Sequence, residues 1–235
     1  MLRLPFEHER FVCWPNSRTL SQKGSATMNS TEKRLIKEYR NVQKELAKNG
    51  DSSLRKSGLL VLQPKSQSDM YEWQCTIQGP SDTPYENAAF DLSIKIPASY
   101  PLVPPLIKFV VLPDERIREL QAEAKQKNGD SEKNEVEQDD NILEKRPAIR
   151  KCYKMPHPNV NFNSGEICLD ILKKRWSPAW TLQSTILAIV VLLSNPEPSS
   201  PLNVDLANLL RCDDKVAYNT LIRFYIKEYS TECAR

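Results

Sequence analysis

The chain has 235 residues, which is enough for one large domain or two small ones and for a sizeable hydrophobic core. Hydrophobic residues make up 40% and charged residues 27%, as in soluble globular proteins, and a net charge of only +3 gives no support to nucleic-acid binding. The longest apolar run, Leu182 to Leu193, is interrupted by Gln183, Ser184 and Thr185 and is too short to span a bilayer. The first 27 residues do not resemble a secretory signal.

The first 28 residues scatter a few aromatic side chains among polar ones without periodicity, so we expect a loosely ordered extension. A helix is predicted to begin at Ser30, with Ser30 or Thr31 as its cap, because apolar residues then recur at helical spacing. Asn49-Gly50 is predicted to end it. Residues 29–235 are interpreted as one domain with an insertion at about 113–151.

Strand-like stretches follow the helix. They are Gly58 to Leu62, Tyr71 to Gln78, Ala89 to Ile96 and Ile107 to Leu112. The second alternates apolar and polar residues with the period of a half-buried strand, and the short connections predict a four-stranded antiparallel meander.

The insertion changes the character of the chain. Residues 114–140 carry ten acidic and five basic side chains. The few apolar residues among them cannot bury enough surface to offset the conformational entropy lost when the segment is ordered. We expect a short solvated helix at about 116–127 and a disordered surface loop beyond it. Two interpretations of this insertion are left open. It is either a surface loop that the fold tolerates, or an element that gates access to the neighbouring segment or binds a partner.

Three helices are predicted after the insertion, at Leu182 to Leu193, Val204 to Leu210 and Lys215 to Tyr229, with Thr181 and Asp213 as caps of the first and last. Strands first and helices afterwards indicate an α+β fold.

The six cysteines fit no C-x-x-C or zinc spacing, which favours reduced thiols in a cytosolic setting. One of them, Cys168, stands in the informative segment His-Pro-Asn-Val-Asn-Phe-Asn-Ser-Gly-Glu-Ile-Cys-Leu-Asp-Ile-Leu, residues 157–172. This segment resembles the active-site signature of ubiquitin-conjugating enzymes. Further motifs stand in the order of that family: Gly79-Pro80, Thr83-Pro84-Tyr85, Tyr100-Pro101, Pro104-Pro105, Trp176-Ser177-Pro178-Ala179 and Pro201-Leu202. The resemblance spans about Ser30 to Tyr229 outside the insertion.

The resemblance implies the ubiquitin-conjugating fold, with Cys168 carrying ubiquitin as a thioester. A relay of this kind needs an accessible thiol that attacks as a thiolate and later leaves. His8 and His157 are the only histidines, so the His-plus-carboxylate pair of a thiol hydrolase is missing, which suits a carrier that must not hydrolyse its own thioester. The alternative for Cys168 is a buried structural cysteine.

Two neighbouring residues have two interpretations each. The Asn159 amide is either a donor to the oxyanion formed during transfer or an organiser of the local loop. For His157, followed by Pro158, we prefer a structural role in the turn over that of a base or metal ligand.

Asp170 and Ser200 are further candidates. Asp170 either orients the incoming nucleophile or is a solvated carboxylate. Many family members carry Asp where this chain has Ser200, and there it helps an attacking lysine. Because a cysteine thiol has a lower intrinsic pKa (about 8.5) than a lysine ammonium (about 10.4), we hypothesise that Ser200 suits an enzyme that also modifies cysteine.

The spacing from Asn159 to Cys168 is nine positions, where most of the family has eight. The chain is similar in this to the peroxisomal peroxin-4 branch. That branch implies docking on a membrane-anchored peroxin at the cytosolic face of the peroxisomal membrane, and transfer of ubiquitin to a cysteine of the cargo-import receptor.

The family also implies a ubiquitin-activating enzyme and RING-type ligases as partners, and neither a metal nor an organic cofactor. Ligase contacts are expected at Leu102, Ser177, Pro178 and Ala179, whereas Trp176 and Trp180 are expected in the core. The alternatives are a carrier of another ubiquitin-like modifier and a non-catalytic ubiquitin-binding scaffold.

Overall fold

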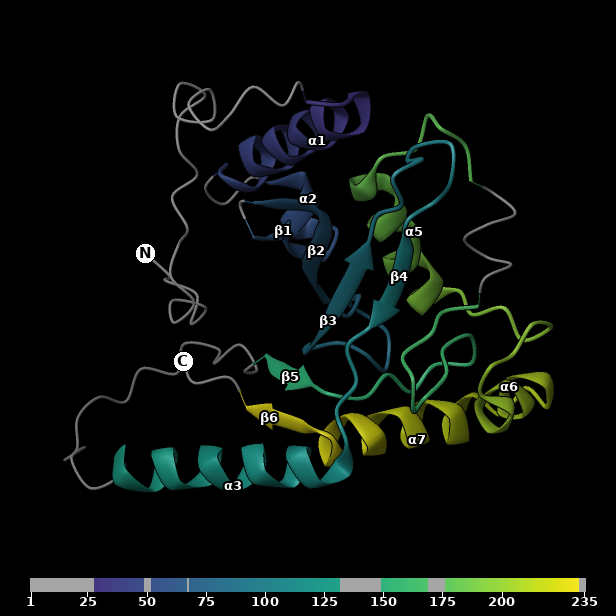
Figure 1. Cartoon of the computed structure of the whole chain (residues 1–235). Helices are drawn as coiled ribbons and strands as arrows, with labels where there is room; N and C mark the ends of the chain where they lie inside the picture. The colour runs from purple at the N-terminus through teal and green to yellow at the C-terminus, as the bar shows by residue number, and fades with distance from the viewer. Residues whose placement is uncertain (1–27, 49–51, 67, 132–148, 169–175, 233–235) are drawn as a thin grey trace.

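The computed structural model describes residues 28–48, 52–66, 68–131, 149–168 and 176–232 (Figure 1). In chain order its elements are α1 Ser30–Leu46, α2 Ser53–Lys56, β1 Leu59–Ser66, β2 Asp69–Gln78, β3 Ala88–Lys95, β4 Leu106–Phe109, α3 Asp114–Ser131, β5 Arg150–Cys152, α5 Leu182–Ser194, α6 Val204–Arg211, α7 Lys215–Glu228 and β6 Ser230–Glu232. The predicted extension lies outside the described residues apart from Met28.

The predicted meander is present. Strands β1 to β4 pair antiparallel in sequence order, and Trp73, Cys75 and Ile77 of β2 point into the core as their alternation predicted. The expected number of four strands was too small, because β5 joins β3 in parallel and β6 pairs antiparallel with β5. These two strands have three residues each, too short for a periodic signal.

Helices α1 and α5 contact the sheet and one another. Leu35 of α1, Trp73 of β2 and Ile186 of α5 are fully buried, and the edge of the Tyr39 ring meets the Trp73 ring at 5.9 Å between centroids. Burial on this scale supplies the main driving force for folding. The run at 182–193 is thus a core helix, and none of the helices in the described part of the chain combines the length and apolar character needed to cross a membrane.

The helix caps correct two predictions. Helix α1 is capped by Asn29, whose Oδ1 accepts from the Glu32 N–H at 2.8 Å while Glu32 accepts from the Asn29 N–H, not by Ser30 or Thr31. Helix α7 is capped by Asp214 rather than Asp213, which adopts a left-handed φ of 55° just before it. The predicted cap of α5, Thr181, is confirmed.

The insertion begins with a longer helix than expected. Helix α3 starts at Asp114 and lies beside β6 (Figure 1). It is attached to the domain, because Ile117 is buried and the Gln121 side chain donates to the carbonyl oxygens of Glu228 and Ser230 at 2.7 and 3.1 Å. The remainder of the insertion, predicted as a disordered loop, lies outside the described residues at 132–148.

Candidate active site

The segment that leads to Cys168 is a narrow loop with two antiparallel legs. Val160 bridges Ile167, and the Cys168 N–H donates to the Asn159 carbonyl at 2.9 Å. At the tip, Asn161 Oδ1 accepts from the backbone N–H groups of residues 163 and 164 at 3.0 Å. The nine-position spacing therefore brings Cys168 back beside Asn159, and the turn at the tip is stabilised by an asparagine side chain.

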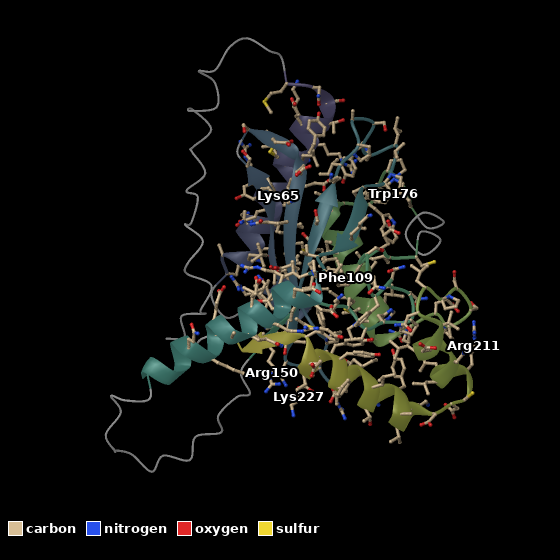
Figure 2. The ribbon with its side chains drawn as sticks, turned by 60° about the horizontal axis from the view of Figure 1, so that its bottom comes forward. Lys65, Phe109, Arg150, Trp176, Arg211 and Lys227 are labelled. Carbon is tan, nitrogen blue, oxygen red and sulfur yellow. The ribbon has the colours of Figure 1, made fainter. Side chains whose placement is uncertain are left out.

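The loop is attached to the end of β4 through Gly165. Its φ is +70°, and its carbonyl accepts from the Phe109 N–H at 2.9 Å. Nearby, Lys108 and Glu166 form an exposed ion pair at 2.6 Å. Phe109 is buried and lies near the centre of the view in Figure 2, whereas the half-buried Trp176 lies toward its upper right. The signature segment at 157–172 included Gly165, but the sequence did not reveal why that position needs a glycine, which is its left-handed φ beside the β4 backbone.

His157 lies fully buried beneath the loop. Its Nδ1 accepts from the Asn159 N–H at 3.0 Å, and its Nε2 is 3.1 Å from the Leu192 carbonyl of α5. Nδ1 is thus an acceptor, so the neutral ring donates from Nε2. Burial lowers the pKa of His157 to about 4, against a smaller opposing effect of the bond to Leu192. Within the described residues, no group of His, Cys, Asp or Glu is arranged to hold a metal ion.

The low pKa of His157 predicts a pH dependence of stability. Because the pKa is about 4 in the folded state and about 6.5 in the unfolded state, the unfolded chain binds the proton first. The stabilisation is complete above about pH 6.5 and is lost as the pH falls toward 4, by about 3 kcal/mol in total. Urea unfolding between pH 7 and 5 should show about 2 kcal/mol of this decline in wild type and in His8→Ala. A decline of equal size in His157→Gln would contradict the assignment.

Asn159 has no exposed surface, and its amide is fully used by the segment at 197–200. Its Nδ2 donates to the carbonyls of Glu197 and Ser200 at 2.6 and 3.0 Å, and its Oδ1 accepts from the Glu197 N–H at 2.9 Å. The carbonyl of Pro158 accepts from the N–H groups of residues 202 and 203. Of the two interpretations of Asn159, this geometry is that of the loop organiser.

Through these bonds Ser200 is placed against the thiol. Its Oγ lies 3.2 Å from Cys168 Sγ, a contact that the distance of 32 residues in sequence did not reveal. The thiol is more covered than the relay role led us to expect, with Cys168 only 9% exposed, in part because the Ser200 hydroxyl lies on it. Asp170 lies outside the described residues.

The expected ligase contacts lie on two neighbouring loops. Leu102 is 76% exposed, Pro178 and Ala179 are exposed, and Ser177 is half-buried. The loops are joined by Trp176, whose Nε1 donates to the Pro101 carbonyl at 2.9 Å. Both tryptophans are half-buried: Trp176 packs against the core, in line with the prediction, whereas Trp180 contacts the Trp176 ring at 6.4 Å between centroids.

A buried carboxylate beneath these loops was missed. Glu38 of α1 accepts from Tyr100 Oη, from Arg34 Nε and from the Leu182 N–H, each at 2.8 Å. It thereby joins α1 to the 98–103 loop and to the start of α5. The signal was available, since Glu38 falls between Leu35 and Val42 on the buried face of the helix.

Comparison with known proteins places this site in a family. The family model described as ubiquitin-conjugating enzyme matches residues 34–117 and 133–226. The chain is 52% identical over 203 residues to a ubiquitin-conjugating enzyme E2-21 kDa of Pichia angusta, covering 86% of this chain and 96% of the relative. It is 45% identical over 204 residues to the E2 ubiquitin-conjugating enzyme PEX4 of Komagataella phaffii, covering 86% and 96%.

A solved structure agrees. The ubiquitin-conjugating enzyme Pex4p of H. polymorpha, crystallised in complex with the soluble domain of Pex22p, superposes with a TM-score of 0.72 at 50% identity, covering 86% of this chain and 100% of that one. The α+β fold, the sequence resemblance and the matched family model therefore agree that the chain belongs to the ubiquitin-conjugating enzyme family.

Proposed function

We propose that Cys168 accepts ubiquitin from an activating enzyme and passes it to a nucleophile on another protein. The Cys168 thiolate attacks the activating enzyme's thioester, forms a new thioester with the carboxyl terminus of ubiquitin and releases the activating enzyme's thiolate. An acceptor amine or thiol then attacks this carbonyl, and Cys168 leaves as the thiolate. The observation that carries the proposal is the position of Cys168 at the base of the loop, beside Asn159, with Sγ 3.2 Å from the Ser200 hydroxyl.

The surroundings suit a carrier. His157 is the nearest imidazole in sequence, and both of its nitrogens are occupied by backbone groups beneath the loop. It is therefore not placed to activate water against the thioester. The Ser200 hydroxyl, 3.2 Å from Sγ, supplies a polar neighbour to the thiol without supplying a base.

The test is incubation with activating enzyme, ATP and ubiquitin, followed by a non-reducing gel. We expect an adduct that reductant removes, that Cys168→Ala abolishes and that Cys212→Ala, which alters an exposed free cysteine, leaves intact. An adduct that forms with another ubiquitin-like modifier and not with ubiquitin would instead identify a different carrier. Failure of wild type to load with any modifier would favour the scaffold.

We further propose that the enzyme acts at the cytosolic face of the peroxisomal membrane. Relatives carry the names PEX4 and peroxin-4, and the similar enzyme Pex4p of H. polymorpha was crystallised with the soluble domain of Pex22p. By this similarity the chain docks on a membrane-anchored peroxin of that type, works with RING-type ligases and modifies the cargo-import receptor. Calorimetric titration with the soluble domain of such a peroxin from the same organism should show a one-to-one complex, and no heat of binding would contradict docking.

Ser200 predicts the choice of acceptor. In single-turnover discharge from preloaded enzyme, Ser200→Asp should speed transfer to free lysine at least about tenfold, because a carboxylate beside the thioester accepts the proton that the lysine amino group must lose to attack as an amine. Transfer to free cysteine should be unchanged, since a thiol needs less assistance. The matched control is Ser199→Asp, which adds the same charge one residue away. Equal lysine rates in wild type and both variants would refute a role for Ser200 in selectivity.

A further inference from the structure

A lysine with little solvent access lies behind the loop that carries Cys168. The Lys154 side chain is 7% exposed, and its Nζ is 3.1 Å from Asp114 Oδ1 in the first turn of α3. The same Nζ lies 5.3 Å from the centre of the Phe162 ring and 5.8 Å from that of Tyr229. A buried ammonium needs such compensation, here from one carboxylate and two aromatic faces.

Each contact of Lys154 belongs to a different part of the chain. Asp114 begins α3, Phe162 stands in the loop between Asn159 and Cys168, and Tyr229 follows α7. The Phe162 ring also meets the rings of Tyr225 and Tyr229, with centroids 5.0 and 5.6 Å away. Besides its attachment to β4, the active-site loop is thus held by Phe162, which belongs to an aromatic cluster beside the Lys154 ammonium.

The backbone around Lys154 is itself fixed. The N–H of Tyr153 donates to the Tyr229 carbonyl at 2.9 Å, and the N–H of Leu112, just before α3, donates to the Tyr153 carbonyl at 3.2 Å. The lysine therefore reaches Phe162 from a strand end that does not depend on the loop. A displacement of about 1 Å at a reacting group can cost about a hundredfold in rate, so restraint at Phe162 has consequences for Cys168.

We propose that Lys154 is a positioning residue for the Cys168 loop, and that the first turn of α3 contributes to transfer by supplying Asp114 as its counter-ion. This proposal rests on the proposed function of Cys168. It gives the first turn of α3 a role that a merely tolerated surface loop would not have. Lys154→Met keeps the length of the side chain but removes the cation, which releases both Asp114 and Phe162.

The test compares four variants by two measurements. Hydrogen exchange is followed at the amides of Asn161, Gly165 and Cys168, each of which donates a hydrogen bond within the loop. Loading with ubiquitin is followed at saturating activating enzyme. In Lys154→Met the hydrogen-exchange rates of these amides should rise about tenfold, and the rate of loading with ubiquitin should fall about tenfold. Lys154→Arg should retain both wild-type values, and Asp114→Asn should change both in the same direction by a smaller factor.

The matched control is Lys151→Met, which removes a neighbouring lysine paired with Asp91 at 2.8 Å, away from the Phe162 cluster. It should leave loop exchange and loading unchanged. If hydrogen exchange in Lys154→Met accelerates equally in β2 and in the loop, the role of Lys154 is merely structural and the proposal is overturned. Unchanged exchange in the loop would also overturn it. If wild type and Lys151→Met do not load at all, the proposed function of Cys168 fails, while the exchange result still decides whether Lys154 restrains the loop.

Discussion

Replacing Asn159 with alanine is expected to lower the free energy of unfolding by about 3 kcal/mol, at about 1 kcal/mol for each of three hydrogen bonds lost from a buried amide. The carbonyls of Glu197 and Ser200 and the N–H of Glu197 would lose their partner together. Because these bonds hold Ser200 against Cys168, loading and discharge should both slow.

Denaturant unfolding combined with single-turnover loading and discharge separates the two interpretations of Asn159. The control is Asn163→Ala in the same loop. Because the Asn163 side chain is exposed, its removal should change the free energy of unfolding by less than about 0.5 kcal/mol. Unchanged stability with loading intact and discharge about a hundredfold slower would indicate an oxyanion donor and would contradict the role derived from the structure.

A Gly165→Ala variant should be destabilised by at least about 3 kcal/mol, combining left-handed backbone strain with overlap. A Cβ at this position would lie 2.0 Å from the Phe109 carbonyl oxygen, which belongs to the backbone and cannot rotate away. The loop would have to separate from β4, and Cys168 would move with it.

The reaction of Cys168 with iodoacetamide, measured alongside thermal unfolding, reports that movement. Gly58→Ala provides the comparison, since it has a positive φ and a 2.8 Å approach to the Gln78 carbonyl oxygen outside the loop. It should cost stability without changing the alkylation rate of Cys168. Wild-type stability and alkylation in Gly165→Ala would show that the loop does not require glycine.

The elements with many periodic residues were predictable from the sequence. Helix α1, the meander and α5 each present an apolar pattern long enough to identify the element and the face it buries. Strands β5 and β6 were not predictable, because their pairing joins Cys152 to Phe90 and Ser230, residues far apart in sequence. In addition, a strand of three mostly polar residues is too short to show an alternating pattern.

The residues of the site could be predicted from the sequence, but the contacts among them could not. The order of motifs pointed to Cys168, Asn159 and Ser200, yet the contact of Ser200 with the thiol depends on how Asn159 holds the 197–200 segment. The limited exposure of Cys168 follows from the same packing. The partner of Lys154 was hidden for another reason, since a charged insertion predicts solvation and not an ion pair with a buried lysine.

The most direct test of Cys168 as the carrier is the chemistry of the bond it forms. In a Cys168→Ser variant loaded with activating enzyme, ATP and ubiquitin, the hydroxyl should form an oxyester that survives reductant and is cleaved by alkali, and mass spectrometry of the digested adduct should locate ubiquitin on residue 168. A reductant-sensitive adduct in that variant, mapped to another cysteine, would contradict the account.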